Sequence, residues 1–192
     1  MTQDHPKWKP ILTLILAIFL LSGCASSMMN KVKPLTAPDE TRALVTFIRP
    51  AYAYFGGAIQ FGLWDSDLFV GIVSAGAYVQ YYAAPGEHVF LARAENWSFV
   101  HAVLEGGKRY YILCKVFPGA WKARVAFDPI RKEDPTTDEE IAGWLKELEP
   151  QGVIPDKVDG YTKPRVEQVR EAVADFRAGN VQYEVLTVED FR

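Results

Sequence analysis

The feature that most constrains this chain is a series of short apolar or alternating runs between Ala43 and Asp128, separated by turn residues. Runs of this kind, spaced at about ten residues, are typical of an all-β fold. Eight strands are expected, at 43–48, 58–64, 68–73, 78–82, 88–94, 99–104, 109–116 and 121–128. We therefore predict a mainly β fold, an antiparallel β-sandwich of about eight strands.

The run at 121–128 shows the alternation most clearly. Its apolar positions are Trp121, Ala123, Val125 and Phe127, and mostly polar residues lie between them. This period of two predicts a strand with one buried and one mostly solvated face. Between two other strands, Pro85 fixes φ near −65° and Gly86 accepts a positive φ, which is the chemistry of a tight turn.

After Arg131 the composition changes to charged, helix-favouring residues. Thr137 and Glu140 have the spacing of a capping box, and they precede an apolar stripe at 141–148. A second helix is expected from Pro164 to a stop at Gly179. The alternating residues at 181–185 then predict a final strand at the edge of this sheet or of a partner's sheet. Residues 132–192 are thus expected to form a helical C-terminal extension of the β-sandwich domain at 42–131.

Charge divides at the same boundary. Residues 24–131 carry 11 basic and 8 acidic side chains, whereas residues 132–192 carry 8 basic and 15 acidic ones. The opposite signs allow the acidic extension to dock on the β-domain or on a partner, and the helices could equally face water. The net charge of −3 and the lack of a basic cluster argue against a nucleic-acid partner.

The N-terminus contains a second informative pattern. The cationic Lys7 and Lys9 precede the apolar run from Ile11 to Leu21, which small residues and Cys24 follow. The apolar run has 11 residues, and a membrane-spanning helix needs about 20. The pattern therefore predicts a signal peptide at 1–23 rather than a transmembrane anchor.

This segment resembles the signal peptide of bacterial lipoproteins. In that family a box like Leu21-Ser22-Gly23-Cys24 is recognised by a lipid transferase and a dedicated signal peptidase. The resemblance implies that Leu21, Ser22 and Gly23 form the peptidase site and that Cys24 carries the lipid, with palmitate as a suitable label. An ordinary signal peptide with a chance cysteine is the alternative. Ala25 stands where the family's inner-membrane signal has aspartate, which favours the periplasmic face of the outer membrane over the inner membrane.

Residues 24–41 are expected to form the lipidated N-terminus and a tether, because they are small, polar and proline-containing without a period. The β-region carries three landmarks, at 43–50, 85–88 and 107–112. On these landmarks, residues 42–130 resemble a family of bacterial lipoproteins that share a sandwich-like module, the domain of unknown function 2846. The resemblance implies a fold and a membrane anchor, and it implies no activity.

Residues that could carry chemistry are few. Cys114 lies in an apolar run and is expected to be a buried, inert thiol. Asp65 and Asp67 share one loop, but their surroundings do not match a calcium-binding loop, so a hairpin turn is expected. His88 and His101 lie on expected strands outside any zinc pattern, which predicts structural imidazoles. We expect no bound metal and no cofactor, since phosphate-loop and dinucleotide motifs are lacking as well.

The aromatic residues are the remaining candidates. Exposed rings can bind glycans or proteins, although most aromatics in a small sandwich belong to its core. The candidate binding surface comprises Trp64, Tyr81, Trp97 and Trp121.

These observations predict a non-catalytic binding or adaptor module that a lipid on Cys24 anchors to the envelope membrane. An envelope protein or peptidoglycan is the expected partner. One alternative is a periplasmic hydrolase that uses His88 or His101 with a carboxylate, and another is a structural envelope protein that acts by self-association.

Overall fold

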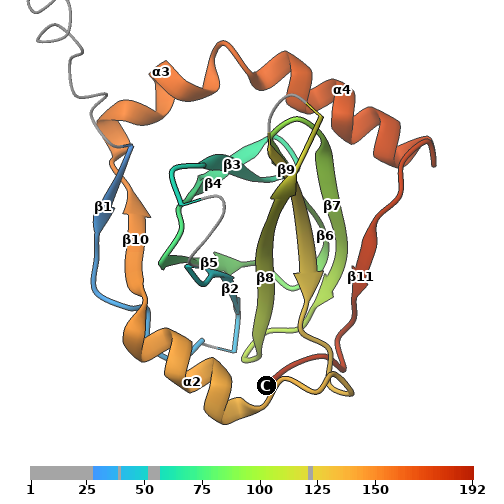
Figure 1. The fold of residues 1–192 in the computed structure, drawn as a ribbon. Coiled ribbons are helices and arrows are strands. Elements are labelled where there is room, and N and C mark those ends of the chain that lie inside the picture. Colours follow the sequence, from blue (N-terminus) through green and yellow to red (C-terminus); the bar gives the residue numbers. More distant parts are fainter. Residues whose placement is uncertain (1–27, 39, 52–56, 121–122) are drawn as a thin grey trace, which may run out of the picture.

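The computed structural model describes residues 28–38, 40–51, 57–120 and 123–192. These residues form two β-sheets that face each other, with helices on the outer faces (Figure 1). The mainly β fold expected from the sequence is confirmed. The lipoprotein box Leu21-Ser22-Gly23-Cys24 and the preceding signal segment lie outside the described residues.

The first sheet has six strands. Their order across the sheet is β1 (Met29–Lys31), β10 (Glu149–Val153), β5 (Ala77–Ala83), β2 (Ala43–Arg49), β8 (Arg109–Pro118) and β9 (Ala123–Pro129). The second sheet has five strands. Their order is β11 (Glu184–Leu186), β7 (Trp97–Leu104), β6 (Gly86–Arg93), β3 (Phe61–Asp65) and β4 (Leu68–Val73). Each of the eight strands expected from the sequence is present in these sheets, with ends that shift by no more than three residues.

The sheets are mixed rather than purely antiparallel. Strand β2 pairs in parallel with β8, β10 with β5, and β11 with β7. Parallel neighbours need a long crossover connection, and here the chain between β2 and β8 includes the strands β3, β4, β6 and β7 of the other sheet. Alternation of apolar residues predicts that a run is a strand, and it does not predict the direction of its neighbours.

The main core lies between the two sheets, and each sheet is also covered on its outer face. The helix α2 (Asp138–Glu147) packs Ile141 against the outer face of the first sheet, in a cluster that includes Ile48 of the fully buried strand β2. The helix α4 (Val166–Arg177) packs Val169 and Val173 on the outer face of the second sheet. Between them lie the 3-10 helix η1 (Pro155–Lys157) and the short helix α3 (Val158–Thr162).

The expected helix signals are confirmed. The Thr137 side chain accepts a hydrogen bond from the Glu140 N–H at 3.1 Å, and the Glu140 carboxylate accepts one from the Thr137 N–H at 2.9 Å. Gly179 follows α4 with a φ of +75°, the left-handed conformation that ends many helices. Helices α2 and α4 correspond to the two predicted helices, whereas the five-residue α3 was not predicted from the sequence.

The C-terminal extension is an integral part of both sheets rather than an appended unit. It supplies β10 to the first sheet and β11 to the second, so the division expected at residues 131 and 132 does not separate two folded parts. The predicted final strand is confirmed as β11 at the edge of the second sheet. The acidic extension therefore docks on the β-domain of the same chain.

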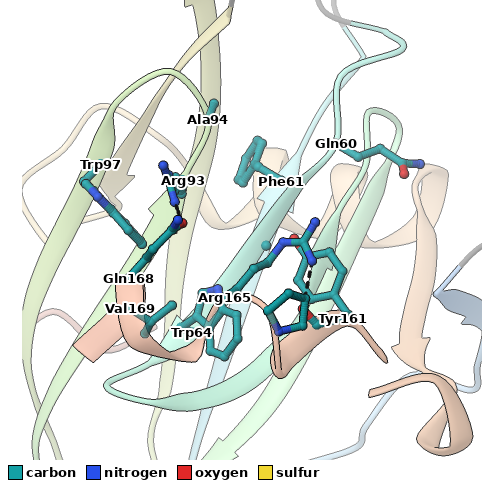
Figure 2. Close-up of a pocket in the computed structure, with 12 residues that line it drawn as sticks. Gln60, Phe61, Trp64, Arg93, Ala94, Trp97, Tyr161, Arg165, Gln168 and Val169 are labelled. Atoms are coloured by element: carbon teal, nitrogen blue, oxygen red, sulfur yellow. Dashed lines mark hydrogen bonds between the residues drawn. The ribbon is translucent and has the colours of Figure 1, made fainter. Parts of the chain in front are cut away.

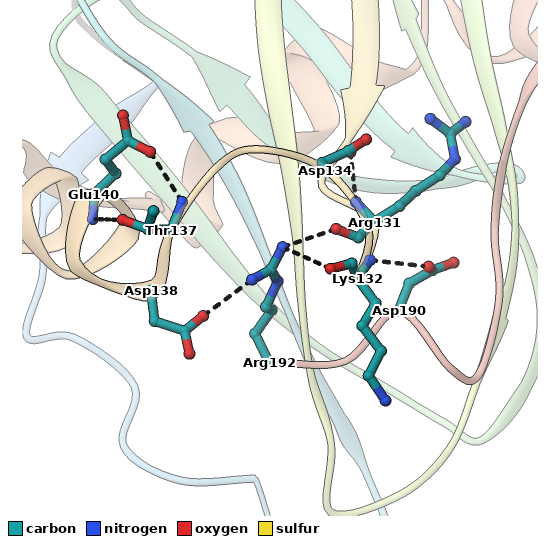
Figure 3. Close-up of polar contacts among 8 residues, drawn as sticks. All are labelled: Arg131, Lys132, Asp134, Thr137, Asp138, Glu140, Asp190 and Arg192. Carbon is teal, nitrogen blue, oxygen red and sulfur yellow. Dashed lines mark hydrogen bonds and ion pairs between the residues drawn. The ribbon is translucent and has the colours of Figure 1, made fainter.

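Ion pairs and hydrogen bonds hold the end of the chain (Figure 3). Buried Asp190 accepts hydrogen bonds from the Thr187 N–H at 2.7 Å and from the Lys132 N–H at 3.3 Å. Arg192 donates to the Arg131 carbonyl at 2.8 Å and pairs with Asp138 at 3.4 Å. These contacts join the last residues to the segment between β9 and α2.

The segment expected to be a tether also contributes to the fold. Within it, β1 pairs antiparallel with β10, and the side chain of Met29 is buried in the main core. The backbone N–H of Leu35 donates to the side chain of Gln80 at 2.7 Å. The three residues of β1 are too few to show a period, and their partner β10 comes from far along the chain, so the sequence pattern did not reveal this strand. Among the described residues, no helix has the length and hydropathy needed to cross a membrane.

Candidate functional site

A cleft of about 550 Å³ lies between the second sheet and the segment that holds α3 and α4 (Figure 2). Its volume is within the range of small-molecule sites. Strands β3 and β6, the start of β7, and the helices contribute to its walls. The lining residues are Gln60, Phe61, Gly62, Trp64, Arg93, Ala94, Trp97, Tyr161, Pro164, Arg165, Gln168 and Val169.

One wall of the cleft is built around Arg93, the last residue of β6. Its guanidinium lies 5.3 Å from the ring centroid of Trp97 and donates a hydrogen bond to the side chain of Gln168 on α4. A cation over an indole face is attracted by the ring quadrupole. Arg93 is thus oriented by a residue of the next strand and by a residue of the covering helix.

The opposite wall is built around Arg165, which precedes α4 (Figure 2). Its guanidinium lies 4.1 Å from the ring centroid of Tyr161 and donates to the Tyr161 carbonyl at 2.9 Å. The Tyr161 ring stacks with Trp64 at 6.4 Å between centroids, and Trp64 is only 2% exposed. Trp64 therefore forms part of the floor, and Tyr161 joins this floor to the arginine.

The composition of the cleft favours an anionic ligand. Its twelve lining residues include two arginines and no Asp or Glu. A guanidinium has five N–H donors, and each arginine uses only one of them in a hydrogen bond within the described structure. Arginine recognises carboxylate and phosphate groups through paired N–H donors. The cleft can accordingly offer charge and hydrogen bonds beside aromatic rings.

The packing of this cleft depends on Gly62. A Cβ atom at this position would lie 2.6 Å from the Tyr161 hydroxyl, which is closer than Cβ atoms pack. We expect Gly62→Ala to push Tyr161 outward and to lower the free energy of unfolding by about 1–3 kcal/mol, as measured by urea unfolding. Gly143→Ala is the matched control, because nothing lies within 4 Å of that Cβ, and on a helix this change should be neutral or stabilising. Equal effects of the two substitutions would contradict the packing at Tyr161.

A polar cluster separate from the cleft is formed by His88, Asp65 and Tyr81. His88 Nδ1 is 2.7 Å from Asp65 Oδ2, and His88 Nε2 is 2.8 Å from the Ala84 carbonyl oxygen. The Tyr81 hydroxyl donates to the same Asp65 oxygen at 3.2 Å. The His88 and Asp65 side chains are 12% and 8% exposed. The cluster therefore joins β3, β5 and β6 at a buried position.

The partners of His88 favour its protonated form. Both are acceptors, and an imidazolium can donate a proton from each ring nitrogen. Burial by itself lowers the pKa of His88, but the hydrogen bond and charge of Asp65 and the Ala84 carbonyl outweigh it and raise the pKa above 6.5. Burial, followed by the charge of Asp65, raises the pKa of Tyr81 to about 12. Both ring nitrogens of His88 are thus engaged by partners within the fold.

The other residues that could carry chemistry lie apart. His101 on β7 contacts the rings of Phe176 and Tyr183, and Asp67 lies 3.7 Å from Arg170. Cys114 is buried as predicted, and this burial raises the pKa of its thiol. Within residues 28–192, apart from those left undescribed, no three His, Cys, Asp or Glu side chains are grouped to hold a metal ion.

The structure brings together two of the four predicted aromatic residues. Trp64 and Trp97 both line the cleft. Tyr81 does not, because it lies on the first sheet and binds Asp65. Trp121 lies outside the described residues. Sequence reasoning missed Arg93 and Arg165, which are 72 residues apart and belong to segments that no local pattern connects.

Comparison with known proteins found no match to this chain among family models, curated proteins or solved structures. The resemblance of residues 42–130 to the lipoprotein module therefore stays a prediction.

Proposed function

We propose that this chain is a lipid-anchored protein of the bacterial envelope that acts as a non-catalytic binding module for an anionic ligand. The anchor is a lipid on Cys24 at the periplasmic face of the outer membrane. The ligand site is the cleft of Arg93, Arg165, Trp64 and Trp97. The observation that carries the proposal is the composition of this cleft, which combines two arginines and aromatic rings without a carboxylate.

The cleft contacts support binding rather than turnover. Each arginine is held against an aromatic ring, so its spare donors are already oriented for an incoming anion. Preorganised donors reduce the entropy lost on binding. The lining residues include no histidine, cysteine, serine or carboxylate, and burial raises the pKa of the Tyr161 hydroxyl, which disfavours it as a general base or nucleophile.

The positions of His88 and His101 do not support the alternative function as a hydrolase. His88 is paired with a carboxylate, but its second nitrogen faces a backbone carbonyl rather than a nucleophile. His101 is surrounded by aromatic rings. Neither residue lines the cleft.

Removing the two cleft arginines tests the ligand site. We expect the full-length chain in detergent micelles to bind inorganic phosphate or glucuronate saturably, with a change in tryptophan fluorescence from Trp97. Charged hydrogen bonds contribute about 1.5–3 kcal/mol each, so the double variant Arg93→Gln, Arg165→Gln should bind these anions at least roughly 100-fold more weakly. Both side chains are exposed, so the variant should fold normally.

The matched control is Arg170→Gln, which removes an exposed arginine on the same helix that does not line the cleft. This control should bind as the unmodified chain does, and glucose should not bind to any of the three proteins. Equal binding of anions to the double variant and to the control would disprove the ligand site. The anchor is tested separately, since Cys24→Ala should abolish labelling of the chain by radioactive palmitate.

A further inference from the structure

The cleft lies at the end of the protein where the N-terminal strand begins. The Ile72 N–H donates to the sulfur of Met29 at 3.3 Å, and Ile72 is paired directly with Gly62, a residue of the cleft. Only one strand therefore separates the start of β1 from the cleft. Figure 1 shows the start of β1 beside the end of β10, from which α3 continues toward α4.

The backbone confirms this arrangement on the other side of β1. The Met28 carbonyl accepts a hydrogen bond from the Ile154 N–H at 2.9 Å. The chain runs directly from Ile154 through η1 into α3, which carries Tyr161 of the cleft wall. Both contacts place the first described residues next to the α3 wall of the cleft.

The chain between Cys24 and this end is short. Five residue steps separate Cys24 from Met29, and even a fully extended chain spans at most about 3.6 Å per step, or about 18 Å in all. A lipid on Cys24 would hold the cleft end of the protein close to the bilayer. The long tether expected from the sequence would have left the orientation of the protein open, whereas a docked β1 limits it.

We infer that the cleft faces the bilayer and binds the anionic headgroup of a membrane phospholipid. This inference rests on the proposed lipid anchor and on the proposed ligand site, and it names the ligand class. Arginine donors suit a headgroup phosphate, and tryptophan and tyrosine rings are the residues that favour the membrane interface. Trp97 and Tyr161 stand beside Arg93 and Arg165 in this cleft.

The test uses the full-length lipidated chain in bilayer discs, with amide hydrogen exchange as the readout. One disc contains only phosphatidylcholine, a zwitterion whose choline group offsets the charge of its phosphate. The other contains phosphatidylglycerol as well, whose phosphate has no such counter-charge. We expect phosphatidylglycerol to slow exchange in the segments 93–97 and 158–169. Each arginine near an anionic surface adds roughly five-fold to affinity, so the double variant Arg93→Gln, Arg165→Gln should need a higher phosphatidylglycerol fraction for the same protection. Arg170→Gln should behave as the unmodified chain.

Inorganic phosphate added to the phosphatidylcholine disc distinguishes the two proposals. Protection of the cleft by phosphate but not by phosphatidylglycerol would overturn the inference and would leave the anion site standing, with a soluble anion as its ligand. Protection by neither would contradict both the inference and the ligand site. Protection of the double variant at the same phosphatidylglycerol fraction as the unmodified chain would show that the headgroup binds outside the cleft, and it would also overturn the inference.

Discussion

Replacing His88 with alanine is expected to lower the free energy of unfolding by about 3–5 kcal/mol, because it leaves the carboxylate of Asp65 buried without its cationic partner. His88 and Asp65 are separated by 2.7 Å, and both side chains are almost entirely buried. The measurement is urea-induced unfolding of the full-length chain in detergent micelles, followed by tryptophan fluorescence. Asp65→Ala should cost less, because burial then lowers the pKa of His88, and the neutral imidazole can still donate to the Ala84 carbonyl.

The same pair makes stability depend on pH in a defined direction. The pKa of His88 is raised in the folded protein, whereas in the unfolded chain it lies near 6.5. Below about pH 6.5 the histidine is protonated in both states and the pair contributes fully. As the pH rises through the raised pKa of the folded state, this contribution is lost. The unfolding free energy should therefore fall over this range in the unmodified chain, and it should change less in His88→Ala.

A surface ion pair provides the control for this prediction. Lys115 and Asp128 also form an ion pair, but their side chains are 38% and 39% exposed. Exposed pairs contribute about 0–1 kcal/mol, so Lys115→Ala should change stability by less than one third of the His88 effect. An equal loss in both variants, or a pH profile of the unmodified chain that matches that of His88→Ala, would contradict the proposed role of the buried pair.

The strands could be predicted from the sequence because their signal is local. Val125 and Phe127 alternate with mostly polar neighbours, and Pro85 and Gly86 mark a turn. Each strand or turn can therefore be recognised from a few consecutive residues. What the sequence did not reveal depends on distant partners. The strand β10 contains Pro150 and Gly152 and has low β-propensity, yet its backbone pairs with both β1 and β5. Pairing of this kind is decided by the tertiary structure.

The cleft also combines residues that could be recognised from the sequence with residues that only the tertiary structure brings together. Trp64 and Trp97 were candidates because large aromatic residues are conspicuous in any sequence. Arg93 and Arg165 are ordinary charged residues at the end of a strand and before a helix, where exposed side chains are the usual interpretation. Only the packing of α4 on the second sheet, through Val169 and Val173, brings the two arginines to one cleft.

Removal of residues 184–192 is expected to cost more stability than any substitution above. This segment holds β11, whose Leu186 is fully buried in the main core. Loss of a buried leucine side chain costs about 2–5 kcal/mol. Loss of the charged hydrogen bonds that join Asp190 to the Lys132 N–H and Arg192 to the Arg131 carbonyl costs about 1.5–3 kcal/mol each. Domains are typically stable by about 5–15 kcal/mol. The shortened chain should therefore lose its cooperative unfolding transition in urea.

If the shortened chain does not fold, single substitutions in the segment 184–192 still measure how much this segment contributes to the free energy of unfolding. Leu186→Ala should cost about 3 kcal/mol and Asp190→Ala about 2 kcal/mol, whereas Asp138→Ala, which removes a 73% exposed partner of Arg192, should cost at most about 1 kcal/mol. Leu186 and Asp190 both attach the segment 184–192 to the rest of the fold. Once one substitution has detached this segment, the second removes less of the free energy of unfolding. The double variant should cost less than the sum of the two. Full additivity would mean that the two residues act independently, and an unchanged transition in the shortened chain would mean that β11 does not stabilise the fold.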